Sequence, residues 1–216
     1  MSRAETTESE RRQRKPRSDG ERSRSAILHA AARLATVEGL DGLSIGRLAD
    51  AVGMSKSGLY AHFRSKEELQ LAIVETASDI FSRVVTEPAD EATSALGRLR
   101  LLVDRYLHYI EVDTFPGGCF FASVLAEVDT QPGAVRDRLI GFLGDWLGRL
   151  ETAIREARSD GAIRPDEDPV QLAFELEAFL FLGNAQYVVA RSLAPLDRAR
   201  AAIERRIAAA LAAPSR

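Results

Sequence analysis

The chain has 216 residues, of which 45% are hydrophobic and 28% are charged, and its formal net charge is −3. This length supports one large domain or two modest ones around a good core. The N-terminus is charged where a signal peptide is apolar, and no stretch approaches the run of about 18 apolar residues that spans a bilayer. We therefore expect a cytoplasmic protein without a membrane partner.

Charge is unevenly distributed along the chain. Residues 1–66 contain 13 Lys and Arg against 8 Asp and Glu, whereas the remainder contains 16 against 24. A basic head on an acidic body suits a protein that binds a polyanion at one end. Residues 1–21 are polar and arginine-rich, so we expect a basic arm that is disordered in isolation. This arm either adds salt-sensitive DNA affinity or is a solvated tail with no role.

Residue types that support catalysis or metal binding are sparse. The single cysteine, Cys119, excludes an intrachain disulfide, and the three histidines are too scattered to form a metal cluster. The sequence has no glycine-rich phosphate loop and no nucleophile elbow. We interpret the acidic residues 166–168, Glu175 and Glu177 as a solvated turn and helix decoration. The expectation is a protein that is not an enzyme and needs no cofactor or metal.

Apolar residues recur at helical spacing along most of the chain, and no segment alternates convincingly as a strand does. Glycine, proline and capping residues divide this pattern into separate helices. The prediction is an all-α fold of about nine helices. In chain order they span residues 22–38, 45–52, 56–62, 65–87, 92–113, 119–129, 132–160, 168–193 and 195 onward.

The second and third of these helices surround a glycine turn. Ser44 is a natural N-cap, Gly53 can take the left-handed conformation of a tight corner, and Ser55 can cap the next helix. Leu59 and Phe63 can face the core. The outward face of this short helix carries hydrogen-bond donors and flat rings, namely Lys56, Ser57, Tyr60 and His62. The arrangement predicts a helix-turn-helix that places one helix in the major groove of DNA.

A further helix starts directly after this unit. Ser65-Lys66-Glu67-Glu68 is a capping box, with Lys66 in the first turn. Lysine there opposes the helix dipole at a cost of a few tenths of a kcal/mol. A bound phosphate would reverse the penalty, because the free N–H groups and the ammonium would both point at it.

The segment from about Arg24 to Thr76 resembles the DNA-binding domain of TetR/AcrR-type transcriptional regulators. The resemblance is most specific at Leu48-Ala49, Val52-Gly53-Met54-Ser55-Lys56, Leu59-Tyr60, His62-Phe63 and Ser65-Lys66-Glu67-Glu68-Leu69. It implies a DNA-binding domain over residues 22–66 and a ligand-binding and dimerisation domain over residues 67–216. It also implies double-stranded DNA as a partner.

The resemblance implies roles for individual residues. Those that hold the DNA backbone are Ser44, Tyr60, His62 and Lys66. Those at or near the bases are Ser55, Lys56, Ser57 and Leu59. The chain departs from the family where members often carry arginine and then an acid, because it has Gly46 and then Arg47. Arg47 is a further candidate for a phosphate contact.

The helix over residues 168–193 is apolar nearly all round, which a single buried face does not explain. It is either the centre of its own fold or part of an interface with a second copy. We favour a homodimer, because two joined reading helices gain effective concentration on DNA. The resemblance implies dimerisation through the last two helices and inverted-repeat DNA sites. Candidate interface residues are Phe181, Leu182, Tyr187, Val188, Ile203 and Ile207.

Several inward aromatic residues carry polar atoms, a mixture found in small-molecule pockets, although most buried aromatics are simply core. The resemblance implies a ligand cavity in the second domain, whose occupation moves the helix that begins at Ser65. Its ligand is unknown. Candidate pocket residues are Phe81, Tyr106, Tyr109, Cys119, Phe120, Phe142, Trp146 and Phe179.

Together these features predict a DNA-binding transcriptional regulator. The resemblance implies a repressor that a small-molecule inducer releases from an inverted-repeat operator. One alternative is a redox or electrophile sensor acting through Cys119, since a thiol at a helix start can have a lowered pKa; against it, a small buried residue fits the same pattern. The other alternative is a ligand-binding dimer without specific DNA recognition, for which Gly46 is the only hint.

Overall fold

The computed structural model describes residues 5–128 and 132–213, and of these it describes residues 5–19, 126 and 128 by their backbone alone. The helices are α1 (Glu5–Glu38), α2 (Ile45–Val52), α3 (Lys56–Tyr60), α4 (Lys66–Phe81), the π-helical η1 (Ser82–Thr86), α5 (Glu87–Asp90), α6 (Ala95–Glu111), α7 (Phe120–Val128), α8 (Ala134–Ser159), α9 (Pro169–Ala190) and α10 (Ala194–Ala210). Because α4, η1 and α5 are continuous, this part of the chain forms nine helical segments. The all-α prediction is confirmed.

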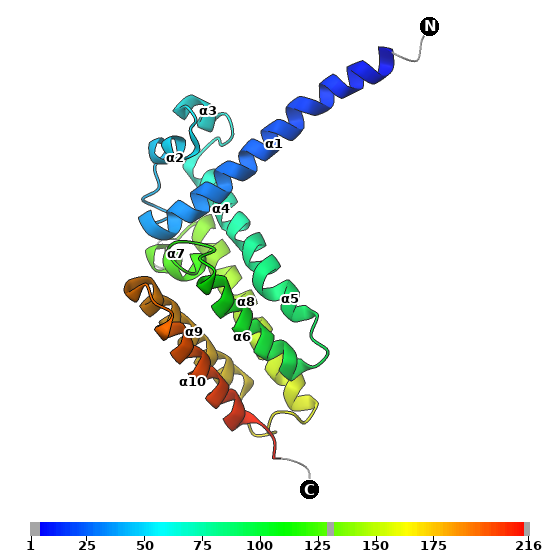
Figure 1. Cartoon of the computed structure of the whole chain (residues 1–216), viewed down its shortest axis with the longest axis vertical. Coiled ribbons are helices and arrows are strands. Elements are labelled where there is room, and N and C mark those ends of the chain that lie inside the picture. Colours follow the sequence, from blue (N-terminus) through cyan, green and yellow to red (C-terminus); the bar gives the residue numbers. More distant parts are fainter. Residues whose placement is uncertain (1–4, 129–131, 214–216) are drawn as a thin grey trace.

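The first helix is longer than the sequence pattern indicated. It begins at Glu5, not near Arg22, and so includes most of the segment expected to be a disordered arm. Arginine, glutamate and glutamine are good helix formers, so they can extend a helix whose other end is packed. In Figure 1 the N-terminal part of α1 projects away from the rest of the molecule. Disorder of this arm in the isolated protein stays a prediction.

The N-terminal head is a small packed unit. The C-terminal half of α1 lies against α2 and α4, and α3 packs on α2 (Figure 1). The side chains that fill its centre are all buried, among them Ile27, Ala31, Leu48, Leu59 and Phe63. Both short helices therefore hold their positions through one shared core.

The body is a bundle of longer helices. α6, α8 and α9 pack on one another, α10 lies along α9, and α4 runs from the head along α8 (Figure 1). Phe81, at the end of α4, forms edge-to-face contacts with Tyr106, Tyr109 and Trp146, at centroid distances of 6.0, 5.5 and 5.3 Å. Hence α4 belongs to the head at one end and to the core of the body at the other.

α9 is long and apolar enough to cross a membrane by length and composition alone. This corrects the expectation that no stretch of the chain is long and apolar enough to span a bilayer. Its buried side chains, such as Leu176 and Leu180, face the bundle, while Phe174 is 66% exposed and Leu182 is 55% exposed. A core helix with apolar residues on its outer face passes the same test, so the property is weak evidence for a membrane span.

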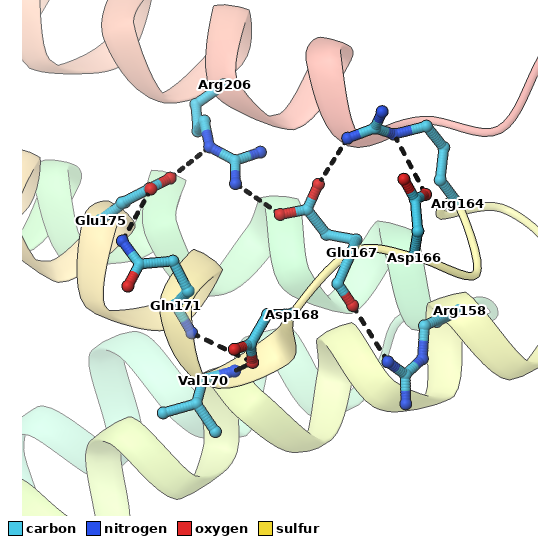
Figure 2. A network of polar contacts seen from close by, with 9 residues as sticks. All are labelled: Arg158, Arg164, Asp166, Glu167, Asp168, Val170, Gln171, Glu175 and Arg206. Atoms are coloured by element: carbon cyan, nitrogen blue, oxygen red, sulfur yellow. Dashed lines mark hydrogen bonds and ion pairs between the residues drawn. The ribbon is translucent and has the colours of Figure 1, made fainter.

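A polar cluster ties the ends of α8, α9 and α10 together (Figure 2). Glu167 is only 6% exposed and accepts hydrogen bonds from Arg164 and Arg206, at 3.0 and 2.5 Å. Arg206 also pairs with Glu175 (Figure 2). Asp168 caps α9 through the N–H groups of its first turn. The interpretation of residues 166–168 as a solvated turn is therefore wrong for Glu167.

Candidate DNA-binding and ligand-binding sites

Local caps fix the geometry of the reading head. The Ser44 hydroxyl accepts the Arg47 N–H at 3.1 Å, and Gly53 closes α2 with φ of 66°. Ser55 caps α3 by accepting the Gly58 N–H at 3.1 Å, and Ser65 caps α4 in the same way. These three caps and the glycine corner confirm the local structure that the sequence predicted.

The outer surface of α3 is open to solvent. Tyr60 is 60% exposed, Ser55, Lys56 and Ser57 are exposed, and His62 is partly exposed. In Figure 1 this helix lies at the far end of the molecule from α9 and α10. The side chains expected at bases and phosphates thus share one accessible end of the protein, apart from Leu59.

Leu59 has the wrong orientation for a base contact. It is completely buried in the core of the head, because it lies one helical turn after the Ser55 cap on the side that faces α2. Its burial contradicts a direct contact with the bases, whereas the expectation that it faces the core is confirmed.

The two candidate cations Arg47 and Lys66 are engaged within the head. Arg47 pairs with Glu38 at 2.8 Å, and the Lys66 ammonium donates to the Asp41 carboxylate at 2.7 Å. The hydrogen bond from Lys66, and then its charge, lower the pKa of Asp41. All of these side chains are at the surface, where such pairs exchange readily with other charges. Either cation can therefore turn to a phosphate.

In the structure Gly46 lies against the end of the Lys56 side chain. A Cβ atom at this position would lie 3.0 Å from Cε of Lys56 and 3.3 Å from its Nζ. Glycine therefore leaves room for the Lys56 side chain to lie across α2. The residue that suggested lost DNA recognition thus lies against a candidate DNA-binding lysine, whose flexible end can also shift to admit a larger side chain.

The body contains an apolar cavity of about 310 Å³ that is lined by residues of α4, α6, α7, α8 and α9 and by Cys119, and is partly open to solvent. Five of the eight candidate pocket residues line it: Phe81, Tyr106, Cys119, Phe142 and Trp146. The other three, Tyr109, Phe120 and Phe179, do not line the cavity. The hydroxyl of Tyr109 instead accepts a hydrogen bond from the Phe120 N–H at 3.4 Å. The residues that sequence reasoning missed are Phe121, Ala122, Leu125, Leu139, Leu143, Leu147, Phe174, Glu177, Ala178 and Phe181.

Glu177 is the charged residue of this cavity wall. The Trp146 indole N–H donates to its carboxylate at 2.7 Å, and burial raises the pKa of Glu177 to about 7. This corrects its interpretation as helix decoration. One signal was present in the sequence, because Glu177 lies one helical turn from both Phe174 and Phe181 and so shares their face.

Cys119 lies in the same wall but is poorly placed for reactivity. It is buried, its backbone N–H donates to the Asn184 side chain at 2.8 Å, and burial raises the pKa of its thiol to about 11. The helix start was expected to lower the pKa of the thiol, but the loss of solvent around the buried sulfur raises it by more.

A second, more open groove of about 560 Å³ shares Phe81, Phe142 and Trp146 with the cavity. It is lined on α8 by Gly144, Gly148 and charged residues such as Asp145. The three shared rings form a wall between an apolar space and a polar one.

Of the candidate interface residues, Phe181 and Leu182 are exposed on α9, and Tyr187 and Val188 are partly exposed. Ile203 and Ile207 are buried within the protomer, where the single apolar stripe of α10 packs on its neighbours. Their assignment to an intermolecular interface is therefore wrong. Val170, Phe174 and Val189 are the large apolar residues exposed on α9 that the sequence analysis missed.

Two family models match the chain. One, described as bacterial regulatory proteins of the tetR family, covers residues 27–73, and the other, a tetracyclin repressor-like C-terminal domain, covers residues 95–203. Transcriptional regulator AcuR of Cereibacter sphaeroides is 28% identical over 74% of this chain and 73% of its own length. Nucleoid occlusion factor SlmA of Sodalis glossinidius is 30% identical over 73% and 74%.

Two solved structures extend the comparison. A TetR transcriptional regulator from Chloroflexus aurantiacus superposes with a TM-score of 0.82 at 24% identity, covering 89% of this chain and 98% of that one. AibR, in complex with isovaleryl coenzyme A and operator DNA, gives a TM-score of 0.63 at 29% identity, covering 74% and 84%. The first likeness concerns the fold, and the second concerns a protein that holds a ligand and DNA.

Proposed function

The chain belongs to the TetR family of DNA-binding transcriptional regulators, and we propose that it is a homodimeric cytoplasmic repressor released from an inverted-repeat operator by a small-molecule ligand. Regulators of this family are not enzymes. The observation that carries the proposal is the course of α4. Its first residue, Lys66, follows the end of the exposed reading helix by six positions, and its last, Phe81, lines the apolar cavity. One helix thus joins the surface for DNA to the space for a ligand.

An ion pair holds α4 to the cavity wall. Arg138 on α8 donates two hydrogen bonds to the carboxylate of Glu75 on α4, from Nε at 2.5 Å and from Nη2 at 2.9 Å. These hydrogen bonds lower the pKa of Glu75, so its carboxylate is ionised at neutral pH. A ligand that shifts α8 therefore pulls on α4, and α4 carries the shift toward the head. By linkage, a ligand that weakens DNA binding must itself bind the DNA-bound form less well.

The proposed dimer uses the outer face of α9 beside α10. Phe181, Leu182 and Val189 are exposed there in the single protomer, and several large apolar side chains exposed on one helix favour an interaction site. A twofold axis would place two copies of α3 on successive turns of DNA, which predicts half-sites about 34–36 Å apart.

The proposed DNA binding is tested by titrating the protein into labelled DNA from the gene's own upstream region and following fluorescence anisotropy at several salt concentrations. We expect salt-dependent binding, and Lys56→Ala should weaken it at least about tenfold and alter its sequence preference. The matched control is Arg155→Ala, which removes a cation from an exposed position of α8. Equal effects of the two variants would contradict the assignment of α3.

The proposed dimer is tested by sedimentation. Leu182→Glu and Val189→Glu place charges at positions that are exposed in the protomer, so folding should be preserved. We expect both variants to sediment as monomers and to lose operator binding. A wild-type chain that sediments as a monomer with full operator affinity would refute the paired arrangement.

A further inference from the structure

We propose that the cavity binds a hydrophobic amine, an apolar molecule whose ammonium group pairs with the carboxylate of Glu177. The inference rests on the ligand-released regulator proposed above and names the chemical class of its ligand. It follows from three features of the cavity: one acid in its wall, the aromatic surface around that acid, and the chemistry of its lining.

The first feature is the setting of Glu177. The carboxylate faces an apolar space and receives the Trp146 N–H at 2.7 Å. A carboxylate offers about four acceptor positions, so one hydrogen bond leaves most of its capacity unused. No cationic side chain in the described part of the protein contributes to the pKa of Glu177, which burial raises to about 7. An acid held in this way gains most from a partner that brings a positive charge.

The second feature is the aromatic surface around the acid. Trp146 stacks on Tyr106 at a centroid distance of 5.6 Å, and Phe121 stacks on Phe142. Ring faces attract cations through their negative quadrupole, most strongly where water is excluded. The same rings cover the apolar body of a ligand. An amine with an aryl or alkyl chain therefore satisfies both the acid and the walls.

The third feature is that the described residues lining the cavity include no lysine, arginine or histidine. An acid or a phosphate-bearing ligand would bring a second negative charge beside Glu177 without a compensating cation. A neutral ligand would bring no charge to Glu177, which would then bind a proton more readily, so the ligand would gain no ionic contact. The volume of about 310 Å³ is near the lower end of the range for ligand pockets, about 300–1,000 Å³, which favours a small molecule.

The experiment uses the intrinsic fluorescence of the full-length protein without DNA. Trp146 is the only tryptophan of the chain, so its emission reports directly on the cavity. Three probes share one skeleton and differ in charge: 4-phenylbutylamine, 4-phenylbutan-1-ol and 4-phenylbutanoate. We expect the amine to bind at least about tenfold more tightly than the alcohol and the alcohol more tightly than the acid.

Two variants test the role of the charge. Glu177→Gln keeps the shape and the acceptor for Trp146, and it should abolish the preference for the amine while leaving the affinity for the alcohol within about twofold. The matched control is Asp145→Asn, which removes a carboxylate next to Trp146 in sequence but on the exposed side of α8. It should retain the preference.

A pH titration of the wild-type protein tests the same pairing without a variant. Tyr106 and Cys119, the titratable groups that line the cavity with Glu177, have pKa values raised well above neutrality and stay uncharged. The amine stays charged, with a pKa near about 10 as for lysine. With the pKa of Glu177 at about 7, the amine should bind roughly tenfold more weakly at pH 6 than at pH 8.

Equal affinities for the three probes, or an amine preference that persists in Glu177→Gln, would overturn the proposal. These results leave the function as a DNA-binding repressor untouched, because no operator is present in the assay. Conversely, amine binding in a protein that does not bind its upstream DNA would refute the proposed function and keep the ligand class.

Discussion

Gly117 donates its backbone N–H to the hydroxyl of Thr36 at 3.1 Å, across 81 positions of the sequence. A Cβ atom on Gly117 would lie 1.9 Å from the backbone oxygen of Thr36, so only glycine permits this approach. Arg33 adds a second contact by donating to the backbone oxygen of Thr114 at 2.8 Å. The loop between α6 and α7 is thus fastened to the C-terminal part of α1.

The same loop contacts α9. The Asn184 side chain accepts the Cys119 N–H at 2.8 Å, and Arg191, at the end of α9, donates to the backbone oxygen of Pro116 at 2.7 Å. Cys119 itself lines the cavity. Residues 114–119 therefore touch the head, the helix proposed for dimerisation and the ligand space, and form a second connection beside α4.

Thr36→Val should weaken this connection while preserving shape. The change leaves the buried N–H of Gly117 without an acceptor, which costs about 1–3 kcal/mol. The free energy of unfolding in urea should fall by that amount. Thr76→Val is the matched control, because the Thr76 hydroxyl only donates to the backbone oxygen of Ala72 in its own helix. Similar losses in the two variants would mean that the contact between loop and head contributes nothing specific.

The parts of the molecule that could be predicted from the sequence are those set by neighbouring residues. Ser44, Gly53 and Ser55 define the reading head because capping and a left-handed corner need only a few adjacent positions. The cavity could not be found in the same way. Glu177 meets Trp146 across 31 positions of the sequence, and that meeting depends on how α9 packs on α8.

Periodicity also left the partner of each apolar stripe undefined. Ile203 and Ile207 occur at helical spacing, which indicates a buried face but not whether the same chain or a second copy covers it. The structure shows that the same chain covers them, whereas Leu182 remains exposed. The surroundings of Gly46 could not be predicted from adjacent residues either, because the side chain next to it, Lys56, belongs to the following helix.

Lys66 and Asp41 provide a test of backbone contacts in DNA binding. If Lys66 exchanges Asp41 for a phosphate, Lys66→Ala should lower the slope of log affinity against log salt by about one. Asp41→Asn should raise operator affinity at low salt, because it frees the ammonium from its intramolecular partner. Anisotropy titrations from low to moderate salt measure both effects. An unchanged slope in Lys66→Ala would remove this lysine from the DNA contacts.

Glu167 should make the stability of the body depend on acid. Hydrogen bonds from Arg206 and Arg164 hold its pKa below the ordinary 4.5. Since its folded pKa is depressed, its stabilising contribution is present above about pH 4.5 and is lost as the pH falls through the folded pKa. Glu167→Gln should cost about 2 kcal/mol at pH 7 and progressively less below pH 4.5.

Urea unfolding between pH 3.5 and 7 measures this dependence. Asp166→Asn is the control, because Asp166 is exposed and lies 3.9 Å from Arg164, and its effect should stay within about 0.5 kcal/mol. A difference between wild type and Glu167→Gln that does not change with pH would exclude the ion pairs as its source.

Cys119 should react slowly in the native protein. With its pKa raised to about 11 by burial, its thiolate fraction at pH 8 is roughly 100-fold below that of an unfolded thiol. The rate of reaction with Ellman's reagent, compared with that of the urea-unfolded chain, should fall by at least this factor. Native labelling within a few-fold of the unfolded rate, together with oxidant-induced release from DNA that Cys119→Ser abolishes, would restore the sensor hypothesis.

Two glycines in long helices should respond to alanine with opposite signs. Gly141 on α8 is exposed, and a Cβ atom there would meet nothing within 4 Å, so Gly141→Ala should stabilise the protein by about 0.5–1 kcal/mol. Gly183 lies where α9 crosses α10, and its Cβ would approach that of Ala199 to 2.8 Å. Overpacking costs about 1–3 kcal/mol, so Gly183→Ala should be destabilising despite its better helix propensity.

A double-mutant cycle separates crowding from propensity at this crossing. Ala199→Gly removes the methyl group that Gly183→Ala would strike, so the double variant should be more stable than the sum of the two single changes predicts, by about 1 kcal/mol. Thermal and urea unfolding provide the four free energies. Strict additivity would show that the helices separate freely at Gly183. Coupling would instead show that α9 and α10 form one rigid pair, so that the exposed face of α9 moves as a unit.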